Sequence, residues 1–99
     1  MLQGQPYNQK VDMWSVGCVL YFMLTSKVPF KSKNLAKLHN NIINAKYDTQ
    51  NNEDYFKVSR NGKDLLHNLI QPNPELRFSA ADALEHGWFK EKEVELIDN

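Results

Sequence analysis

The chain has 99 residues, of which 41% are hydrophobic and 24% are charged, as in an ordinary globular domain or part of one. Its twelve basic and twelve acidic residues cancel, which argues against nucleic acid as the main partner. A single cysteine, Cys18, excludes an internal disulfide and is expected to be a small buried hydrophobe. With no signal peptide and no apolar run near the roughly 20 residues of a membrane span, the sequence predicts a cytoplasmic protein.

The first predicted element is an apolar helix over residues 13–24, preceded by Lys10 and Asp12. A helix that is apolar on every side must be buried, so we expect this one to pass through the middle of the domain. Residues 1–9 contain a glycine and a proline and predict an irregular lead-in. Pro29 predicts the stop, because the residue before a proline disfavours helix.

A second helix is predicted over residues 34–47, with Asn34 as its N-cap. Its apolar residues recur at three- and four-residue steps, at Leu35, Leu38, Ile42 and Ala45. Polar residues fall mostly between them, so this helix is expected to lie at the surface with one face packed.

Residues 48–57 are polar and acidic and predict a solvated loop. A calcium-binding EF-hand loop that began at Asp48 would require glycine at its sixth position and glutamate at its twelfth. Those positions hold Glu53 and Ser59, so no calcium site is predicted.

Two further helices are predicted, and no strand. Residues 59–71 carry four apolar residues on one face, Leu65, Leu66, Leu69 and Ile70. Ser79 and Asp82 fit a capping box that begins the last helix, one side of which is expected to hold Ala80, Ala83, Leu84 and Trp88. Residues 91–99 predict a charged tail or linker, as helix or as extended chain.

Two motifs far apart in the chain carry a resemblance to a known family. They are Asp12-x-Trp14-Ser15-x-Gly17-x-x-x-Tyr21 with Pro29-Phe30, and Pro74-x-x-Arg77-x-Ser79-Ala80-x-x-Ala83-Leu84-x-His86-x-Trp88-Phe89. Together they resemble helices F, G, H and I of the large lobe of eukaryotic protein kinases. The resemblance implies an all-α helical subdomain, incomplete as a fold on its own, with residues 1–90 as the C-terminal portion of a kinase catalytic domain. Within that family it most resembles the calcium/calmodulin-dependent and calcium-dependent group.

The resemblance also implies roles for single residues. Asp12 would accept hydrogen bonds from the backbone of the catalytic loop; the alternative is an aspartate that only favours the positive end of its helix. Trp14 and Gly17 would be packing residues, Gly17 because a neighbour approaches too closely for a side chain. Arg77 would be buried and paired with a glutamate of the activation segment; the alternative is a surface arginine.

A docking surface is implied on the second helix, at Leu38, His39 and Ile42. No residue of the chain is predicted to be catalytic, or to bind a cofactor or a metal ion. The three histidines fall on three different predicted helices without a partner at metal-ligand spacing, and only His86 is expected to anchor a turn.

The sequence lacks the glycine-rich loop, the catalytic loop and the metal-binding Asp-Phe-Gly motif that a kinase needs. The resemblance therefore implies the scaffold and substrate side of a Ser/Thr protein kinase, inert alone, whose parent uses ATP and Mg²⁺. Its partners would be the rest of the kinase domain, protein substrates, and a regulatory segment or calcium-binding module. Two alternatives remain open: a non-catalytic, pseudokinase-like helical interaction module, and an unrelated helical adaptor.

Overall fold

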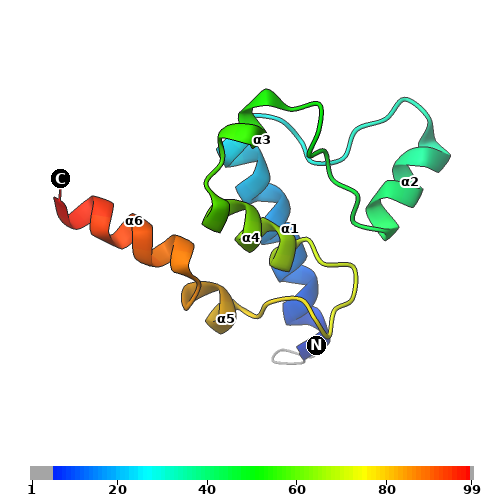
Figure 1. Cartoon of the computed structure of the whole chain (residues 1–99). Coiled ribbons are helices and arrows are strands. Elements are labelled where there is room, and N and C mark those ends of the chain that lie inside the picture. The colour runs from blue at the N-terminus through cyan, green and yellow to red at the C-terminus, as the bar shows by residue number, and fades with distance from the viewer. Residues whose placement is uncertain (1–5, 99) are drawn as a thin grey trace.

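The structure, a computed structural model, describes residues 6–98, and side chains for residues 9–92. Within that range it consists of helices and loops without a strand, as predicted. The helices are α1 (Pro6–Thr25), α2 (Leu35–Ile43), α3 (Glu53–Lys57), α4 (Arg60–Leu69), α5 (Ala80–Leu84) and α6 (Gly87–Asp98). Figure 1 shows α1 in the middle, with α2 and α6 projecting on opposite sides.

Helix α1 is longer than predicted. It begins at Pro6, a residue that favours the first turn of a helix because its missing N–H would have no partner there. The predicted irregular lead-in is therefore wrong for residues 6–9, and its remainder, residues 1–5, lies outside the described residues. The helix ends at Thr25, where Ser26 turns left-handed with a φ of 62° and donates its N–H to the Phe22 carbonyl at 2.7 Å.

Helices α1 and α4 cross at Gly17, which is buried. A Cβ at this position would lie 2.8 Å from Leu69 Cβ and 2.9 Å from Ile70 Cγ1, closer than carbon atoms can pack. Helix α4 begins where Ser59 caps it, its Oγ accepting the Gly62 N–H at 3.0 Å. The predicted reason for Gly17, the close approach of a neighbour, is confirmed.

The core forms around this crossing in two clusters. One holds Met13, Leu65, Leu69 and Ala83, and the other holds Tyr21, Tyr55, Leu66 and Ile70. All four apolar residues predicted for the third helix are therefore buried. Both clusters combine residues of α1 with residues of α4, so α1 is the element on which the fold is assembled.

The prediction of a solvated loop over residues 48–57 is confirmed for residues 48–51 but wrong for residues 52–57, where α3 forms. Asn52 is fully buried, and its side chain caps α3 by accepting the Asp54 N–H at 3.1 Å. The same side chain donates from Nδ2 to the Tyr21 hydroxyl at 3.0 Å, and that hydroxyl donates to the Asp48 carbonyl at 2.6 Å. Polar residues are buried here because each finds a hydrogen-bond partner.

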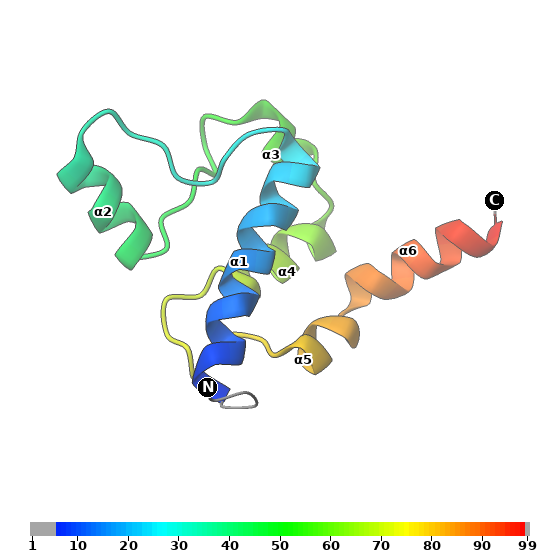
Figure 2. The same cartoon turned by 180° about the vertical axis from the view of Figure 1, so that it is seen from behind.

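Helix α2 begins at the predicted N-cap, where Asn34 Oδ1 accepts the Lys37 N–H at 3.0 Å. It ends earlier than predicted, because Ala45 turns left-handed with a φ of 53° and Lys46 donates its N–H to the Asn41 carbonyl at 2.8 Å. None of its residues is buried. The two views from opposite sides both show α2 standing away from the other helices (Figures 1 and 2).

The last helix is broken in two. The capping box of Ser79 and Asp82 is confirmed, and α5 follows it. Of the residues expected on its apolar side, Ala83 is buried and Trp88 is half-buried, whereas Ala80 and Leu84 are exposed, so the prediction is wrong at those two positions. The chain turns at His86 before α6 begins, so Trp88 belongs to a separate helix. His86 anchors that turn as predicted: Nδ1 accepts the Trp88 N–H at 3.0 Å, and Nε2 lies 2.7 Å from Asp64 Oδ2.

The backbone of α6 runs without a break through position 90, so the stretch expected to be a tail continues as helix to Asp98. Among the helices of residues 6–98, none is both long enough and apolar enough to span a bilayer.

The crossing gives a first prediction. Gly17→Ala should lower the free energy of unfolding by about 1–2 kcal/mol, because overpacking costs about 1–3 kcal/mol and outweighs the gain of about 1 kcal/mol in helix propensity. Denaturant unfolding followed by circular dichroism measures the change. Ser15→Ala, on the exposed face of the same helix, is the matched control and should be neutral or slightly stabilising. Equal stability of the two variants would contradict the close crossing.

Candidate functional site

Helix α1 has one buried face and one exposed face, so the prediction that it is buried all round is wrong. Met13, Gly17 and Tyr21 are buried against the other helices, whereas Val19 and Met23 are 58% and 72% exposed. The reason is that α3 and α4 pack on the same side of α1. Figure 2 shows the other side of α1 with no helix in front of it.

The exposed face is hollowed into an apolar groove of about 330 Å³. Its lining residues are Ser15, Val16, Val19, Leu20 and Met23. Apolar side chains gathered on one exposed face are typical of a surface that contacts another part of a protein or a partner.

Asp12 lies at the end of this groove. Residues that lie four, seven or eleven positions apart share one face of a helix. Asp12 is therefore on the same face as Val16, Val19 and Met23. Its carboxylate is exposed. The helix dipole acts most strongly within the first turn of a helix. Because α1 begins at Pro6, Asp12 lies beyond that turn. The alternative, in which Asp12 only favours the positive end of its helix, therefore loses its basis.

Arg77 is buried, with 7% of its surface exposed, so the alternative of a surface arginine is wrong. Its Nε donates to the Gln71 carbonyl at 2.8 Å, and Nη1 donates to the Lys10 carbonyl at 2.7 Å. Nη2 contacts the Pro72 carbonyl at 3.4 Å. A buried guanidinium is stable when its donors meet acceptors in this way.

The guanidinium also lies over an aromatic ring. Arg77 Cζ is 5.1 Å from the centroid of the Trp14 ring, and that ring also stacks in parallel on Phe30 with the two centroids 5.8 Å apart. In the opposite direction, Lys10 Nζ donates a hydrogen bond to the Arg77 carbonyl. These contacts form what we call the Arg77 corner, namely Lys10, Trp14, Phe30 and Arg77, where α1 meets the loop after α4 and the loop before α2.

A second groove, of about 270 Å³, lies between α2 and the Arg77 corner. It is lined by Val11, Trp14, Ile42, Ile43, Pro72 and Arg77. Of the three predicted docking residues only Ile42 lines this groove; Leu38 is partly buried elsewhere and His39 is exposed. Ile43, which lies eight residues after Leu35 and therefore on the apolar face of α2, lines the groove but was not among the predicted docking residues.

The titratable groups show no nucleophilic or metal centre in the described part of the chain. Burial raises the pKa of the Cys18 thiol, which keeps it protonated and unreactive. Burial also raises the pKa of the Tyr21 hydroxyl, consistent with its role as a neutral hydrogen-bonding group in the core. Among described residues, no three His, Cys, Asp or Glu side chains lie close enough to hold a metal ion.

A buried arginine and a close helix crossing at a glycine, both built on one apolar helix, are features that the resemblance to the kinase large lobe led us to expect. Residues 1–89 match the family model of the protein kinase domain, and the chain belongs to that family.

Among curated relatives, the chain is 43% identical over 86 residues to the serine/threonine-protein kinase cds1 of Schizosaccharomyces pombe, covering 84% of this chain and 18% of that protein. It is 39% identical over 84 residues to calcium-dependent protein kinase 21 of Oryza sativa, covering 85% and 15%. The described helices also match the solved structure of the Rad53 kinase domain and SCD2 in complex with AMPPNP. That match has a TM-score of 0.80 and 35% identity over 86% of this chain and 34% of that one. The chain thus spans about a fifth of its curated relatives' length and a third of a solved kinase chain.

Arg77 supplies the second prediction. Arg77→Lys should destabilise the fold by about 1–3 kcal/mol, because an ammonium cannot reach the separate carbonyls that the planar guanidinium bridges and cannot stack on Trp14 in the same way. Arg60→Lys at the exposed start of α4 is the control, with a change within about 0.5 kcal/mol. Thermal and denaturant unfolding measure both, and a silent Arg77→Lys would mean that the corner does not hold the fold together.

The exposed groove of α1 supplies the third prediction. We expect the 99-residue chain to associate through this face, so size-exclusion chromatography with light scattering should show oligomers. Replacing Val19 and Met23 together by lysine should shift the chain towards monomer, whereas Leu35→Lys with Ile43→Lys on α2 should not. A monomer that melts cooperatively without any substitution would count against an unpartnered α1 face.

Proposed function

We propose that this chain forms the helical part of the large lobe of a Ser/Thr protein kinase, with α1 as helix F, α2 as helix G, α4 as helix H, and α5 with α6 as helix I. The support is the family match, the fit to the Rad53 kinase domain and the order of the helices. Relatives named as serine/threonine-protein kinases support protein phosphorylation as the activity of the parent.

The observation that carries this proposal is the exposed face of α1, where a carboxylate ends an apolar groove. On this proposal the catalytic loop of the parent covers the groove, and Asp12 accepts hydrogen bonds from its backbone N–H groups. A carboxylate that accepts such bonds holds a loop in one geometry, and catalysis of phosphoryl transfer depends mostly on positioning and charge stabilisation. Asp12 is thus a positioning residue.

The Arg77 corner would support the activation segment. Trp14 and Arg77 line the second groove, and the contacts of Arg77 with backbone carbonyls fix its guanidinium at that edge. The resemblance brings a glutamate of the activation segment to this place, which remains a prediction. Gly17 would contribute only by letting α4 approach α1, so its part in activity is indirect.

ATP and Mg²⁺ would act in the parent on groups that this sequence does not contain. The Rad53 kinase structure holds AMPPNP, an ATP analogue, which supports nucleotide binding by the matching parent domain. The chain by itself would be inactive, because it offers neither a glycine-rich loop nor the catalytic and metal-binding aspartates.

Helix α2 would be the docking surface for a protein substrate or regulator, through Leu38, His39 and Ile42. It stands away from the other helices, and none of its residues is buried. The same exposure favours the second candidate, a pseudokinase-like interaction module, which would use α2 without any phosphoryl transfer. A regulatory calcium-binding module and an intracellular location also remain predictions. One relative is named as a calcium-dependent kinase, whereas cds1 is named only as a serine/threonine-protein kinase.

A chimeric kinase tests the proposal and gives the fourth prediction. Residues 1–89 replace the matching segment in the kinase domain of Schizosaccharomyces pombe cds1, and phosphorylation of a protein substrate is measured. The chimera should be active. Asp12→Ala in it should lower kcat by roughly a hundredfold through a misplaced catalytic loop, with the KM for ATP nearly unchanged.

Asp54→Ala on α3 is the matched control, since it removes a carboxylate away from the groove and should leave kcat within about twofold. A chimera that melts cooperatively but transfers no phosphate would reject the kinase scaffold in favour of the interaction module. An Asp12→Ala variant as active as the control would reject the role of Asp12.

A further inference from the structure

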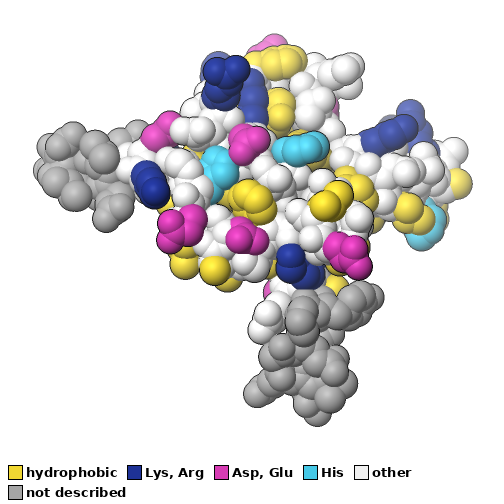
Figure 3. Space-filling model, turned by 60° about the horizontal axis from the view of Figure 1, so that its bottom comes forward, with side chains coloured by type: hydrophobic (Ala, Val, Ile, Leu, Met, Phe, Trp, Pro, Cys, Tyr) yellow, Lys and Arg dark blue, Asp and Glu magenta, His cyan; other side chains and the backbone are white. Residues whose placement is uncertain are grey.

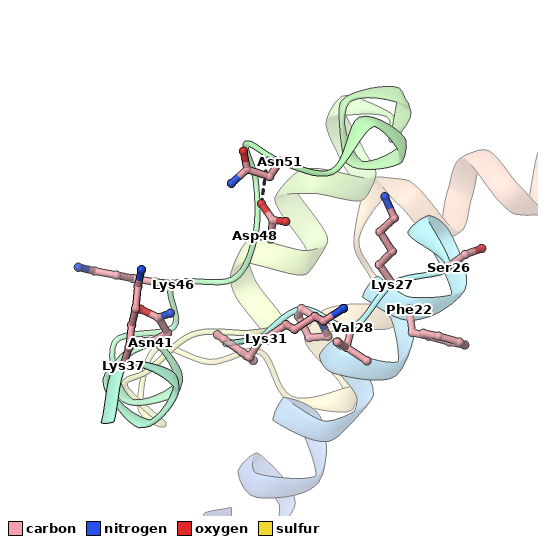
Figure 4. Close-up of a pocket in the computed structure, with 12 residues that line it drawn as sticks. Phe22, Ser26, Lys27, Val28, Lys31, Lys37, Asn41, Lys46, Asp48 and Asn51 are labelled. Carbon is pink, nitrogen blue, oxygen red and sulfur yellow. Dashed lines mark hydrogen bonds between the residues drawn. The ribbon is translucent and has the colours of Figure 1, made fainter. Parts of the chain in front are cut away.

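A pocket of about 570 Å³ lies between the end of α1, helix α2 and residues 46–51. Figure 4 shows Lys27 and Lys31 on its α1 side, Lys37 and Lys46 on its α2 side, and Asp48 and Asn51 between them. Four of the pocket's twelve lining residues are thus lysines, which is unusual for a chain with no net charge.

The charge of the chain is segregated along the sequence. No acidic residue occurs between Asp12 and Asp48, and this stretch holds five of the chain's lysines. The stretch therefore carries a charge of +5 and the rest of the chain −5, a separation that the zero total conceals. In Figure 3 the α2 end, at the right, shows dark blue, yellow and cyan side chains, whereas the middle and left of the molecule carry both magenta and dark blue ones.

The four pocket lysines are not neutralised within the described structure. None of them makes an ion pair there; the one recorded ion pair among described residues joins His86 and Asp64. Asp48, the only acidic residue in the lining, turns its carboxylate to its own loop, where Oδ1 accepts the N–H groups of Gln50 and Asn51 at 3.1 and 2.9 Å. Like charges gathered around a concave surface raise the local potential and attract an anion.

The rest of the pocket is apolar or neutral. Phe22, Val28, Pro29 and Phe30 supply apolar surface, and Asn41 and Asn51 supply amides. A free inorganic anion would use only the lysines, whereas a peptide with a phosphate next to an apolar side chain would use both kinds of surface. The volume suits one or two residues of such a peptide, and a single hollow does not offer the row of cations that a nucleic acid strand requires.

We propose that this pocket binds a phosphoserine- or phosphothreonine-containing segment of a partner protein. Lysine recognises a phosphate as a point charge, without the two-pronged geometry of arginine. Binding is therefore selective for the charge of the phosphate more than for its orientation. The proposal goes beyond the kinase scaffold and does not rest on it, because the pocket shares no residue with the α1 groove and only Phe30 with the Arg77 corner.

Fluorescence polarisation with the 99-residue chain tests this proposal and gives the fifth prediction. The probe is a labelled hexapeptide with one phosphoserine followed by leucine, compared with the same peptide carrying serine. The phosphorylated probe should bind at least about tenfold more tightly, and its affinity should fall as salt is raised from about 0.05 to 0.2 M. Inorganic phosphate should compete only weakly, since it leaves the apolar surface unused.

The variant pair Lys31→Glu with Lys37→Glu should lose at least about tenfold in affinity for the phosphorylated probe. Lys33→Glu is the matched control: it lies two residues from Lys31 and is exposed but outside the pocket, so binding should stay within about twofold. Helix content of each variant, followed by circular dichroism, separates lost binding from lost folding. Equal binding of both peptides, an equal loss with Lys33→Glu, or stronger binding to phosphatidylserine vesicles or a single-stranded oligonucleotide would overturn the proposal.

Discussion

The close contact of α1 with α4 at Gly17 is the constraint on which the rest of the structure depends. With no side chain at this position, Leu69 and Ile70 reach the α1 backbone, and the residues one turn away on either side, Met13 and Tyr21, enter the two core clusters. Close-packed interiors transmit such a requirement, because a methyl group at the crossing would separate both clusters at once. The positions of α3 and α5 follow from the same crossing, since Tyr55 and Ala83 complete those clusters.

The Arg77 corner is a second constraint, made of polar contacts. It joins Arg77 to Lys10, 67 residues apart in the chain, through hydrogen bonds in both directions. A cation is costly to bury, and here backbone carbonyls and the face of Trp14 offset that cost. The corner also sets where the loop before α2 runs, because Trp14 stacks on Phe30. The place of α2, which has no buried residue of its own, is thereby determined by its flanking loops.

Helix α1 combines two tasks that its sequence does not distinguish. Both of its faces are apolar, yet one forms the core and the other a groove with Asp12 at its end. The chain belongs to the protein kinase family but covers only part of each kinase that it matches. We therefore propose that this groove contacts the remainder of a kinase domain. The pocket lined by Lys27, Lys31, Lys37 and Lys46 lies at the C-terminal end of the same helix. The proposed phosphopeptide site and the groove proposed to bind the catalytic loop are therefore separate surfaces.

The sequence by itself determined the features that act within a few residues or through a family motif. These include the caps at Asn34 and Ser79, the turn at His86, the need for glycine at position 17 and the burial of Arg77. Such signals are legible because a cap or a helical spacing needs only its neighbours in the chain.

Only the tertiary structure decided which face of α1 is exposed, that Asn52 and Tyr55 are buried in a polar stretch, and that Leu84 is left in solvent. It alone also gathered lysines from both sides of α2 into one pocket. The physical reason is that exposure and charge clustering depend on what packs against a residue from distant parts of the chain. An apolar run shows the same pattern in the sequence whether that neighbour is present or not.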